Sequence, residues 1–514
     1  MLTPFEVCSI FVKVESKEPI GLDMAASWGA IQMDWTLIFV VLILWYILLR
    51  NWERNGVLDR WNATRVFGII LMVRSSRGLK ILDKVAKPRK FWRFYGEISL
   101  WVCMISMLMV GLLMLLAFIS TLISPPTTAP PSASEMVAIP GLNPMIPLGW
   151  GALAFVIALV IHEFGHGLQA RAHGMRIRSF GLLQLGPLPL GAFAEPQYEE
   201  LMNAPPRERM RMFAAGPATN IFAAFFCLIM IGGLASQFVI TDENIHVRGI
   251  IQDQGAYDAG IEPWDTIESI DGKDIHGIDS FYTTMDDYSA NDTVGIVVKH
   301  QDGTIENLTA TFSDKYDYFI ESGWIQCGEN LCQGFNSVNV SKGDPFLGIS
   351  GITNSAAGID RLAGPLSPRW DGTVVQKAIT VVPHTLSLMI IPFELQGVSM
   401  HPFEESILEA DDDGLASLIG KSGLLFLTNL FFWLMWVNIL LGFTNLIPMV
   451  PFDGGHLFRD FLRGLLKGVR NIGKKLKMWD INPMWIEHLS SKASSLSSFV
   501  LLGMILFILV IPYF

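Results

Sequence analysis

The chain has 514 residues, of which 51% are apolar and 17% are charged, and its mean hydropathy is +0.40. This composition is typical of membrane proteins and argues against an ordinary soluble enzyme. The formal net charge of −11 argues against nucleic-acid binding, and five cysteines are too few for a disulfide scaffold.

Several apolar runs approach the length of about 20 residues that a helix needs to cross a bilayer. No basic segment or cleavage site precedes the first of them, so we interpret it as an anchor that is retained and not as a signal peptide. The sequence therefore predicts a polytopic α-helical membrane protein with about six spans. These spans are 34–49, 98–123, 148–170, 212–239, 422–448 and 495–514.

The lysines and arginines predict which side each loop faces. Residues 50–97 carry twelve of them, whereas 124–146 carry none. Because cytoplasmic loops are enriched in these residues, the first loop is expected in the cytoplasm and the second outside. Span 148–170 then runs inward, span 212–239 runs outward, and a large segment from about 240 is external.

A seventh apolar run, 372–396, would break this order if it crossed the membrane. The stretch 397–421, with six acids and one lysine, would then be cytoplasmic, and the basic stretch 459–477 would be external. Both placements contradict the distribution of positive charge. We therefore interpret 372–396 as an amphipathic helix that lies on the outer membrane surface or dips into it.

The stretch "LVIHEFGHGL" places three ionisable groups inside an apolar span. His162 and His166 are four residues apart, so on a helix they share one face and can bind the same zinc ion. Glu163 between them has the position of a general base, which takes a proton from the attacking water and later gives one to the leaving nitrogen. Two imidazoles bonded only to backbone are the structural alternative, but ionisable groups inside a membrane usually have a function.

A catalytic zinc site normally has three protein ligands, so a third is expected on another span. The segment "GFTNLIPMVPFDGGHLFRD" is broken by prolines and glycines close to the end of span 422–448. Such irregular backbone is tolerated only where protein or a cavity satisfies it. Asp453 in this break is the candidate third ligand, with His456 as the alternative.

These motifs together resemble the site-2 protease family of intramembrane zinc metalloproteases. The resemblance rests on His162-Glu163-x-x-His166 and on Asn445-x-x-Pro-x-x-Pro-x-Asp453-Gly-Gly. "GPATN", which ends at Asn220, is similar to the motif of the family's middle core span. The resemblance implies a three-helix catalytic core and associates Asn220 and Asn445 with substrate binding, although polar amides in apolar spans also serve ordinary interhelical hydrogen bonding.

Two more segments carry family features. Residues 178–196 resemble the family's re-entrant β-segment that meets the unwinding substrate. Residues 245–312 resemble a PDZ module, a small α/β domain, which is expected on the extracytoplasmic side. Beyond it, a disulfide between Cys327 and Cys332 is an open possibility if the segment faces an oxidising compartment.

We divide the chain into five regions. An N-terminal part with anchor spans and a basic loop (1–146) precedes the first catalytic part with HEFGH and the β-segment (147–239). The extracytoplasmic PDZ-like region (240–371) and a surface helix with an acidic loop (372–421) follow. The last region (422–514) holds the FDGG motif, a basic cytoplasmic segment and the final span.

The sequence thus predicts a zinc metalloendopeptidase in the cell membrane that cleaves unwound single-span membrane proteins near the cytoplasmic face. Its expected partners are these substrates and the lipid bilayer, and the oligomeric state is left open. A non-catalytic scaffold that binds chain tails through the PDZ-like region is the alternative. A transporter is a third possibility, since broken spans with buried His or Asp also serve ion pathways.

Overall fold

The computed structural model describes residues 35–75, 77–125, 132, 134–186, 188–239, 245–322, 325–327, 332–334 and 340–513. The chain divides into two compact units, and each is described by itself. The sheet unit contains Gly232–Gly372 and Met400–Leu425. The helical unit lies within Asp23–Ile231, Thr373–Ser399 and Phe426–Phe514.

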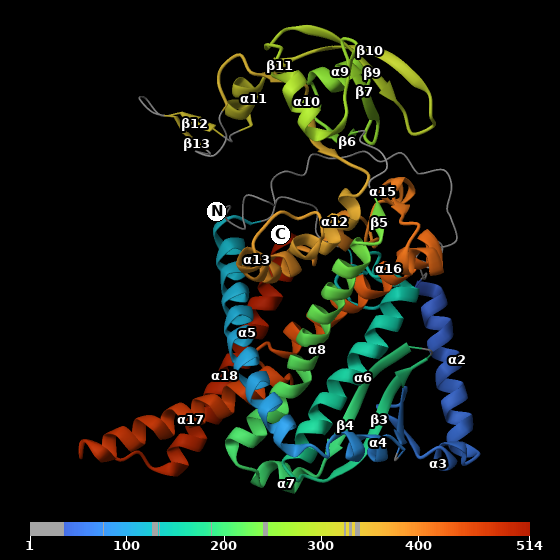
Figure 1. The fold of residues 1–514 in the computed structure, drawn as a ribbon. Helices are drawn as coiled ribbons and strands as arrows, with labels where there is room; N and C mark the ends of the chain where they lie inside the picture. Colours follow the sequence, from blue (N-terminus) through green and yellow to red (C-terminus); the bar gives the residue numbers. More distant parts are fainter. Residues whose placement is uncertain are drawn as a thin grey trace. The chain divides into compact units, whose positions relative to one another are not determined.

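Six helical segments in the described residues are long and apolar enough to cross a membrane, which confirms the prediction of a polytopic α-helical, integral membrane protein (Figure 1). Five of them overlap predicted spans. The first predicted span, 34–49, lies in α2 (Trp35–Arg54), and its crossing stays a prediction. The six are Arg89–Ile123 (α5), Leu148–Ala172 (α6), Pro206–Ala235 (α8), Val374–Glu394 (α13 and α14), Gly414–Asn445 (α16) and Pro483–Tyr513 (α18 and the short 3₁₀ helix η3, Ile511–Tyr513).

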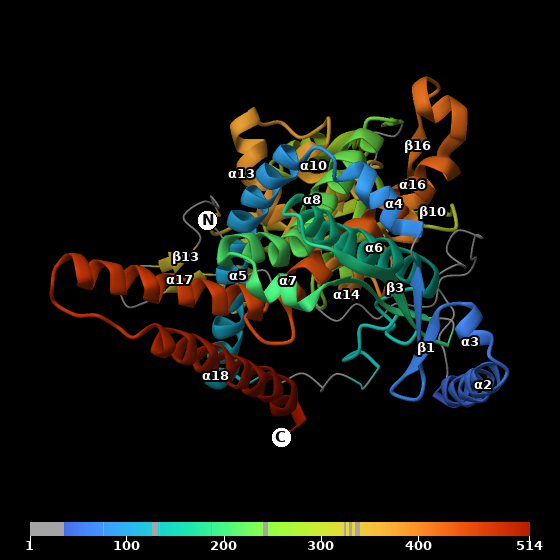
Figure 2. The same ribbon diagram turned by 90° about the horizontal axis from the view of Figure 1, so that it is seen from below.

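The sixth candidate, Val374–Glu394, contains the run that we interpreted as a surface helix. It is long and apolar enough to cross, but it consists of α13 (Val374–Ser387) and the short α14 (Ile391–Glu394). Thr373 and Gln376 form a capping box that fixes where α13 begins. Within the helical unit, α2 is seen end-on in Figure 2 while α13 is seen from the side, so α13 lies across the direction of α2. Its location at the membrane surface stays a prediction.

The helical unit also holds a four-stranded antiparallel sheet beside α6. Its strand order is β1-β2-β3-β4, so β4 is an edge strand. The strands are β1 (Ala63–Val66), β2 (Ile70–Ser75), β3 (Ile177–Leu185) and β4 (Leu188–Pro196). The segment 178–196 lies in the hairpin of β3 and β4, and α7 (Tyr198–Asn203) leads from it to α8.

Two helices of the helical unit flank the break in the FDGG region. α16 ends at Asn445 and α17 (Asp453–Lys475) begins at Asp453, so the chain is non-helical between them. α18 (Pro483–Val510) begins with Pro483 in its first turn, where a missing N–H costs nothing, and the Asn482 side chain caps it.

The sheet unit is built on a second antiparallel sheet. Its strand order is β10-β9-β7-β6-β15, with β8 paired to β7. Alternate residues of β9 (Thr293–Lys299) are buried, and with Ile267, Ile270 and Phe281 they form one apolar core. The PDZ-like nature of this unit stays a prediction. The remaining elements of the unit's core are β6 (Ile245–Ile250), β7 (Thr266–Ile270), β8 (Lys273–Asp274), β10 (Ile305–Thr311), β15 (Ile349–Thr353), α9 (Gly255–Ala259) and α10 (Gly277–Met285).

Shorter elements complete the description. The strands β12 (Ile325–Cys327) and β13 (Cys332–Gly334) pair with Cys327 opposite Cys332 in the backbone register. The side chains of these cysteines lie outside the described part of the chain, so their disulfide stays an open possibility. The other elements are α3 (Val57–Arg60), α4 (Arg77–Val85), β5 (Phe238–Val239), β11 (Ser313–Asp314), α11 (Lys315–Glu321), β14 (Pro345–Phe346), α12 (Ala357–Ala363), η2 (Gly364–Leu366), α15 (Pro402–Ile407) and β16 (Glu409–Ala410).

Candidate metal centre and active site

Three predicted ligands converge on one point in the helical unit. His162 and His166 lie one turn apart on α6, and their Nε2 atoms are 3.1 Å apart. Asp453 Oδ2 lies 3.2 Å from each of these Nε2 atoms. The structure thus brings together side chains from α6 and α17 that are nearly 300 positions apart in the sequence, and within the described residues they form a cluster suited to a metal ion.

The hydrogen bonds of the two imidazoles show which nitrogen faces the cluster. His166 Nδ1 lies 2.8 Å from Met212 O, which can only accept, so Nδ1 carries the proton. His162 Nδ1 lies 2.7 Å from Asn220 Oδ1. The Asn220 amide nitrogen donates to Ala158 O and to Asn438 Oδ1, which leaves its oxygen to accept from His162. Both Nε2 atoms therefore turn a lone pair toward the Asp453 carboxylate.

This donor set fits zinc. Two neutral imidazole nitrogens and a carboxylate oxygen at this spacing repel one another unless a cation or a proton lies between them. Atoms bound tetrahedrally to one zinc at about 2.0–2.2 Å are about 3.3–3.6 Å apart, close to the 3.1 and 3.2 Å found here. The acceptors on the two Nδ1 atoms are the outer partners that hold metal-binding histidines in orientation.

Glycines allow the backbone to approach this cluster closely. A Cβ at Gly216 of α8 would overlap His166 Nε2 and would lie 2.7 Å from His162 Nε2. A Cβ at Gly454 would lie 2.5 Å from the carbonyl oxygens of Leu446 and Ile447, and one at Gly455 would lie 2.6 Å from Val450 N. Gly216 is therefore needed because α8 packs directly against the two histidines, whereas Gly454 and Gly455 let the first turn of α17 pack against the backbone of the segment before it.

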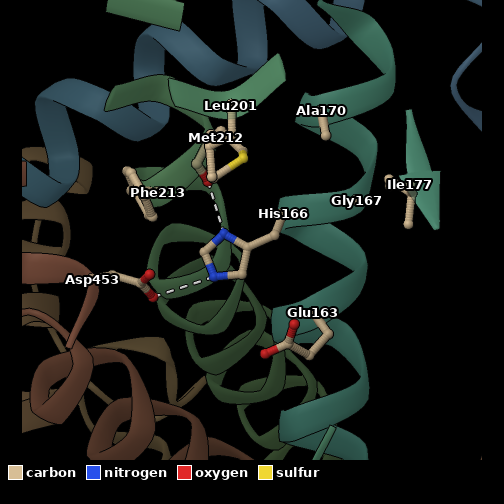
Figure 3. A pocket seen from close by; sticks show the side chains of 9 residues that line it. All are labelled: Glu163, His166, Gly167, Ala170, Ile177, Leu201, Met212, Phe213 and Asp453. Carbon is tan, nitrogen blue, oxygen red and sulfur yellow. Dashed lines mark hydrogen bonds and ion pairs between the residues drawn. The ribbon is translucent and has the colours of Figure 1, made fainter. Parts of the chain in front are cut away.

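A cavity of about 260 Å³ opens beside the cluster (Figure 3). Glu163, His166 and Asp453 line one part of it, and Figure 3 shows Glu163 and His166 projecting from the same helix. The rest of the wall is apolar. Its members are Gly167, Ala170, Ile177, Leu201, Met212 and Phe213. The space is larger than one water molecule needs, so it has room for part of a ligand.

The other predicted site residues, Asn220, Asn445 and His456, lie outside the cluster of His162, His166 and Asp453. Asn220 is fully buried behind His162. Asn445 is the last residue of α16, and its amide donates to Leu441 O of the same helix at 3.0 Å. The ring of His456 stacks on Phe213 with 4.6 Å between the ring centroids. His456 is thus not part of the cluster that His162, His166 and Asp453 form.

Residues 150–478 match the family model described as peptidase family M50, which is well over half of the chain. The chain belongs to this family. The match contains all three residues of the candidate metal centre and Glu163. It confirms the predicted class, a site-2-protease-like metalloendopeptidase of the membrane. Zinc as the cofactor is confirmed by the family together with relatives named zinc metalloproteases and by the His-His-Asp cluster.

The chain is similar to several curated proteins, and two of the three described here are named as zinc metalloproteases. The uncharacterized protein MJ0971 of Methanocaldococcus jannaschii is 29% identical over 245 residues, which cover 48% of this chain and 62% of that protein. The putative zinc metalloprotease Cj1068 of Campylobacter jejuni is 23% identical over 336 residues, 60% of this chain and 81% of the relative. The zinc metalloprotease Rip1 of Mycobacterium tuberculosis is 24% identical over 388 residues, 64% and 89% of the two chains. The match to MJ0971 thus spans less than two thirds of that protein.

In this M50 chain, residues that the sequence analysis missed hold Asp453 in place. Three serines of α18 bond to backbone of the turn before α17 and of its first residues: Ser497 Oγ donates to Pro448 O, Ser498 Oγ accepts from Val450 N, and Ser494 Oγ donates to Gly455 O. The stretch "SSLSS", 494–498, is a group of polar residues at the start of an apolar run. This pattern is the one feature of the sequence that could have indicated these serines as hydrogen-bonding groups.

A buried ion pair joins α17 to α8. Arg209 Nε and Nη2 lie 2.6 and 2.5 Å from the two carboxylate oxygens of Asp460, and both side chains are almost completely buried. Asp460 follows Asp453 by two turns of the same helix, so the pair fixes α17 against the helix that supplies Met212 and Asn220. Removing one partner would leave an uncompensated buried charge.

One prediction separates a positioning role of Asn220 from substrate binding. Asn220→Ala removes the acceptor for His162 Nδ1, and we expect zinc affinity to fall by about 10- to 100-fold, as for other outer partners of metal ligands. Competition with a fluorescent zinc chelator measures this. The control is Asn445→Ala, which removes a bond to Leu441 O only. If Asn220→Ala kept full zinc affinity and raised KM alone, substrate binding would be the better account.

Proposed function

We propose that this chain hydrolyses peptide bonds of single-span membrane proteins inside the membrane, near its cytoplasmic face. The observation that carries the proposal is the convergence of His162, His166 and Asp453 beside a cavity that Glu163 also lines. These three residues would hold Zn²⁺, which supplies polarisation of the scissile carbonyl and a lowered pKa for an attacking water.

The proposed chemical roles follow from the positions of the chain's own groups. Glu163 is the general base that takes a proton from the attacking water and the general acid that returns one to the leaving nitrogen. Asn220 and Met212 O are positioning groups, because they fix the ring orientation of His162 and His166. Gly216 has no Cβ and so allows α8 to lie directly against the two rings.

Substrate would enter in an extended form, since the carbonyls of a helical span are already hydrogen-bonded. The edge strand β4 is the proposed docking strand, because an unpaired sheet edge can bind an extended chain through its backbone. The basic residues of 50–97 and the arginines between Arg171 and Arg211 support a cytoplasmic location of this end of α6.

The apolar part of the cavity would receive the substrate side chain next to the scissile bond. Leu201→Ala on α7 enlarges this space, and we expect it to favour a large side chain there over a small one by about tenfold relative to the unchanged protein. The ratio of kcat/KM for two substrates that differ at this residue measures the shift. Met202→Ala, at an exposed neighbour on α7, is the matched control, and an equal shift in both variants would contradict the assignment.

The proposal is tested with the purified protein and a single-span substrate in one bilayer. We expect specific cleavage, its loss with a zinc chelator and its recovery when zinc is added back. Zinc measured by elemental analysis should equal about one ion per chain. A scaffold would keep zinc and cleave nothing, and a transporter would move an ion or solute without cleavage.

A further inference from the structure

Helix α17 carries an apolar stripe that the rest of the helical unit leaves open. Phe461, Leu465, Val469 and Ile472 on the helix, and Leu476 just after it, are 41%, 53%, 38%, 57% and 58% exposed. Their spacing of four, four, three and four residues keeps them on one face. α17 is not among the candidate spans, so a crossing of the membrane does not explain this stripe.

Positive charge repeats on the same helix with the same spacing. Five basic residues each precede a stripe residue by two positions, which turns them by about 200° to the opposite side of the helix. Arg463 pairs with the exposed Glu487, and Arg470 and Lys474 pair with the exposed Asp480. The two acids of α17 itself do not neutralise the positive charge of this basic face. Asp453 lies in the metal centre, and Asp460 binds Arg209. These five residues are Arg459, Arg463, Lys467, Arg470 and Lys474, and Lys475 is a further lysine at the end of the helix.

The direction of α17 also differs from that of the spans. Within the helical unit, α17 is seen lengthwise in both views, whereas α2 is upright in Figure 1 and end-on in Figure 2. Both figures show α17 extending away from α6 and α8. α17 thus lies across the direction of α2, which is the orientation expected of a helix along the membrane surface.

We propose that α17 lies in the cytoplasmic membrane interface and binds anionic lipid headgroups. A helix with Lys and Arg on one face and Phe, Leu, Ile and Val on the other is suited to this interface. The cytoplasmic leaflet supplies anionic lipids that attract basic segments close to a span. The apolar stripe contacts the acyl chains, and the basic side chains extend to the headgroups at the flanks of the helix. This inference concerns lipid binding and does not depend on the proposed hydrolysis.

The test uses the full chain in nanodiscs of phosphatidylcholine, with or without phosphatidylglycerol. An environment-sensitive fluorophore is attached at Leu465→Cys on the stripe or at Lys467→Cys on the basic face, and quenching by nitroxide-labelled lipid is measured. The unmodified chain, labelled in parallel, gives the background from the native cysteines. We expect strong lipid quenching at position 465, weak quenching at 467, and a larger contrast with phosphatidylglycerol.

Charge variants test the lipid specificity. Replacing Arg459, Lys467 and Lys474 by Gln should lower the ratio of membrane-bound to unbound α17, measured by lipid quenching at position 465. We expect a decrease of about fivefold for each residue replaced, and only in discs with phosphatidylglycerol. Lys299, Lys315 and Lys342 of the sheet unit, replaced together, are the matched control and should change nothing. Equal quenching at 465 and 467 would overturn the proposal. So would a label at 465 that is shielded from water but not quenched by lipid, because the stripe would then be covered by protein.

Discussion

Glu163→Gln is expected to leave zinc bound and to lower the rate of peptide-bond hydrolysis by about 10²- to 10⁴-fold. The amide has nearly the shape of the carboxylate, but it cannot take a proton from the attacking water at neutral pH. Because His162, His166 and Asp453 are unchanged, the zinc content should stay at the level of the unmodified protein. Cleavage of a single-span substrate and elemental analysis of the same preparation measure the two quantities together.

The control for this variant is Glu321→Gln, an exposed glutamate at the end of α11 in the sheet unit. It removes the same charge without touching the cavity and should leave cleavage unchanged. If Glu163→Gln cleaved at the rate of the unmodified protein, the general-base role would be refuted. A loss of zinc in this variant would instead assign Glu163 to the ligands.

Asp453→Ala is expected to remove zinc and activity together. Changing an outer partner of a metal ligand already costs about 10- to 100-fold in affinity, so removal of one of three ligands should cost at least about 100-fold. The two imidazoles on α6 would remain, but without the carboxylate 3.2 Å from each Nε2. Zinc affinity from chelator competition and the rate of cleavage should fall in parallel.

His456→Ala is the decisive comparison for this variant. His456 was the alternative ligand on sequence grounds, and its ring stacks on Phe213. We expect His456→Ala to keep zinc and most of the activity, with some loss of stability from the missing ring contact. Retention of zinc by Asp453→Ala together with its loss from His456→Ala would reverse the assignment.

The α6 part of the site could be predicted because it is local. A separation of four residues places His162 and His166 on one face of any helix, and the apolar surroundings made three ionisable groups unusual. The third ligand needed a different argument. Nothing in the sequence fixes a distance between residues 166 and 453. We selected Asp453 because a carboxylate can be the third zinc ligand and because the break near the end of span 422–448 is expected on the same side of the membrane as His166.

The supporting groups could not be predicted in the same way. A backbone acceptor such as Met212 O has no sequence signature, and one serine in an apolar span is as consistent with an exposed hydroxyl as with a bond to a distant turn. Arg209 and Asp460 are separated by 251 positions, and only the fold brings them into contact. Asn220 was found by its motif, but its hydrogen bond to His162 was not predicted.

Several helices begin earlier than the predicted spans, for a physical reason. Hydropathy placed the second span at 98–123, whereas α5 begins at Arg89. Its first turns carry Arg89, Lys90 and Arg93, which a hydropathy argument excludes although a helix continues through charged residues once it leaves the hydrocarbon. The same holds for α18, which begins at Pro483 and not near 495.

The split origin of the metal centre has a consequence for biosynthesis. Its first two ligands are made with the first third of the chain and the last only after residue 453, so a nascent chain has no complete site while most of its spans are inserted. Under the proposed function, the growing chain therefore has no peptidase site until Asp453 has been made. A zinc ion held by His162, His166 and Asp453 would also stabilise the folded state, because it would bind only when α6 and α17 have come together.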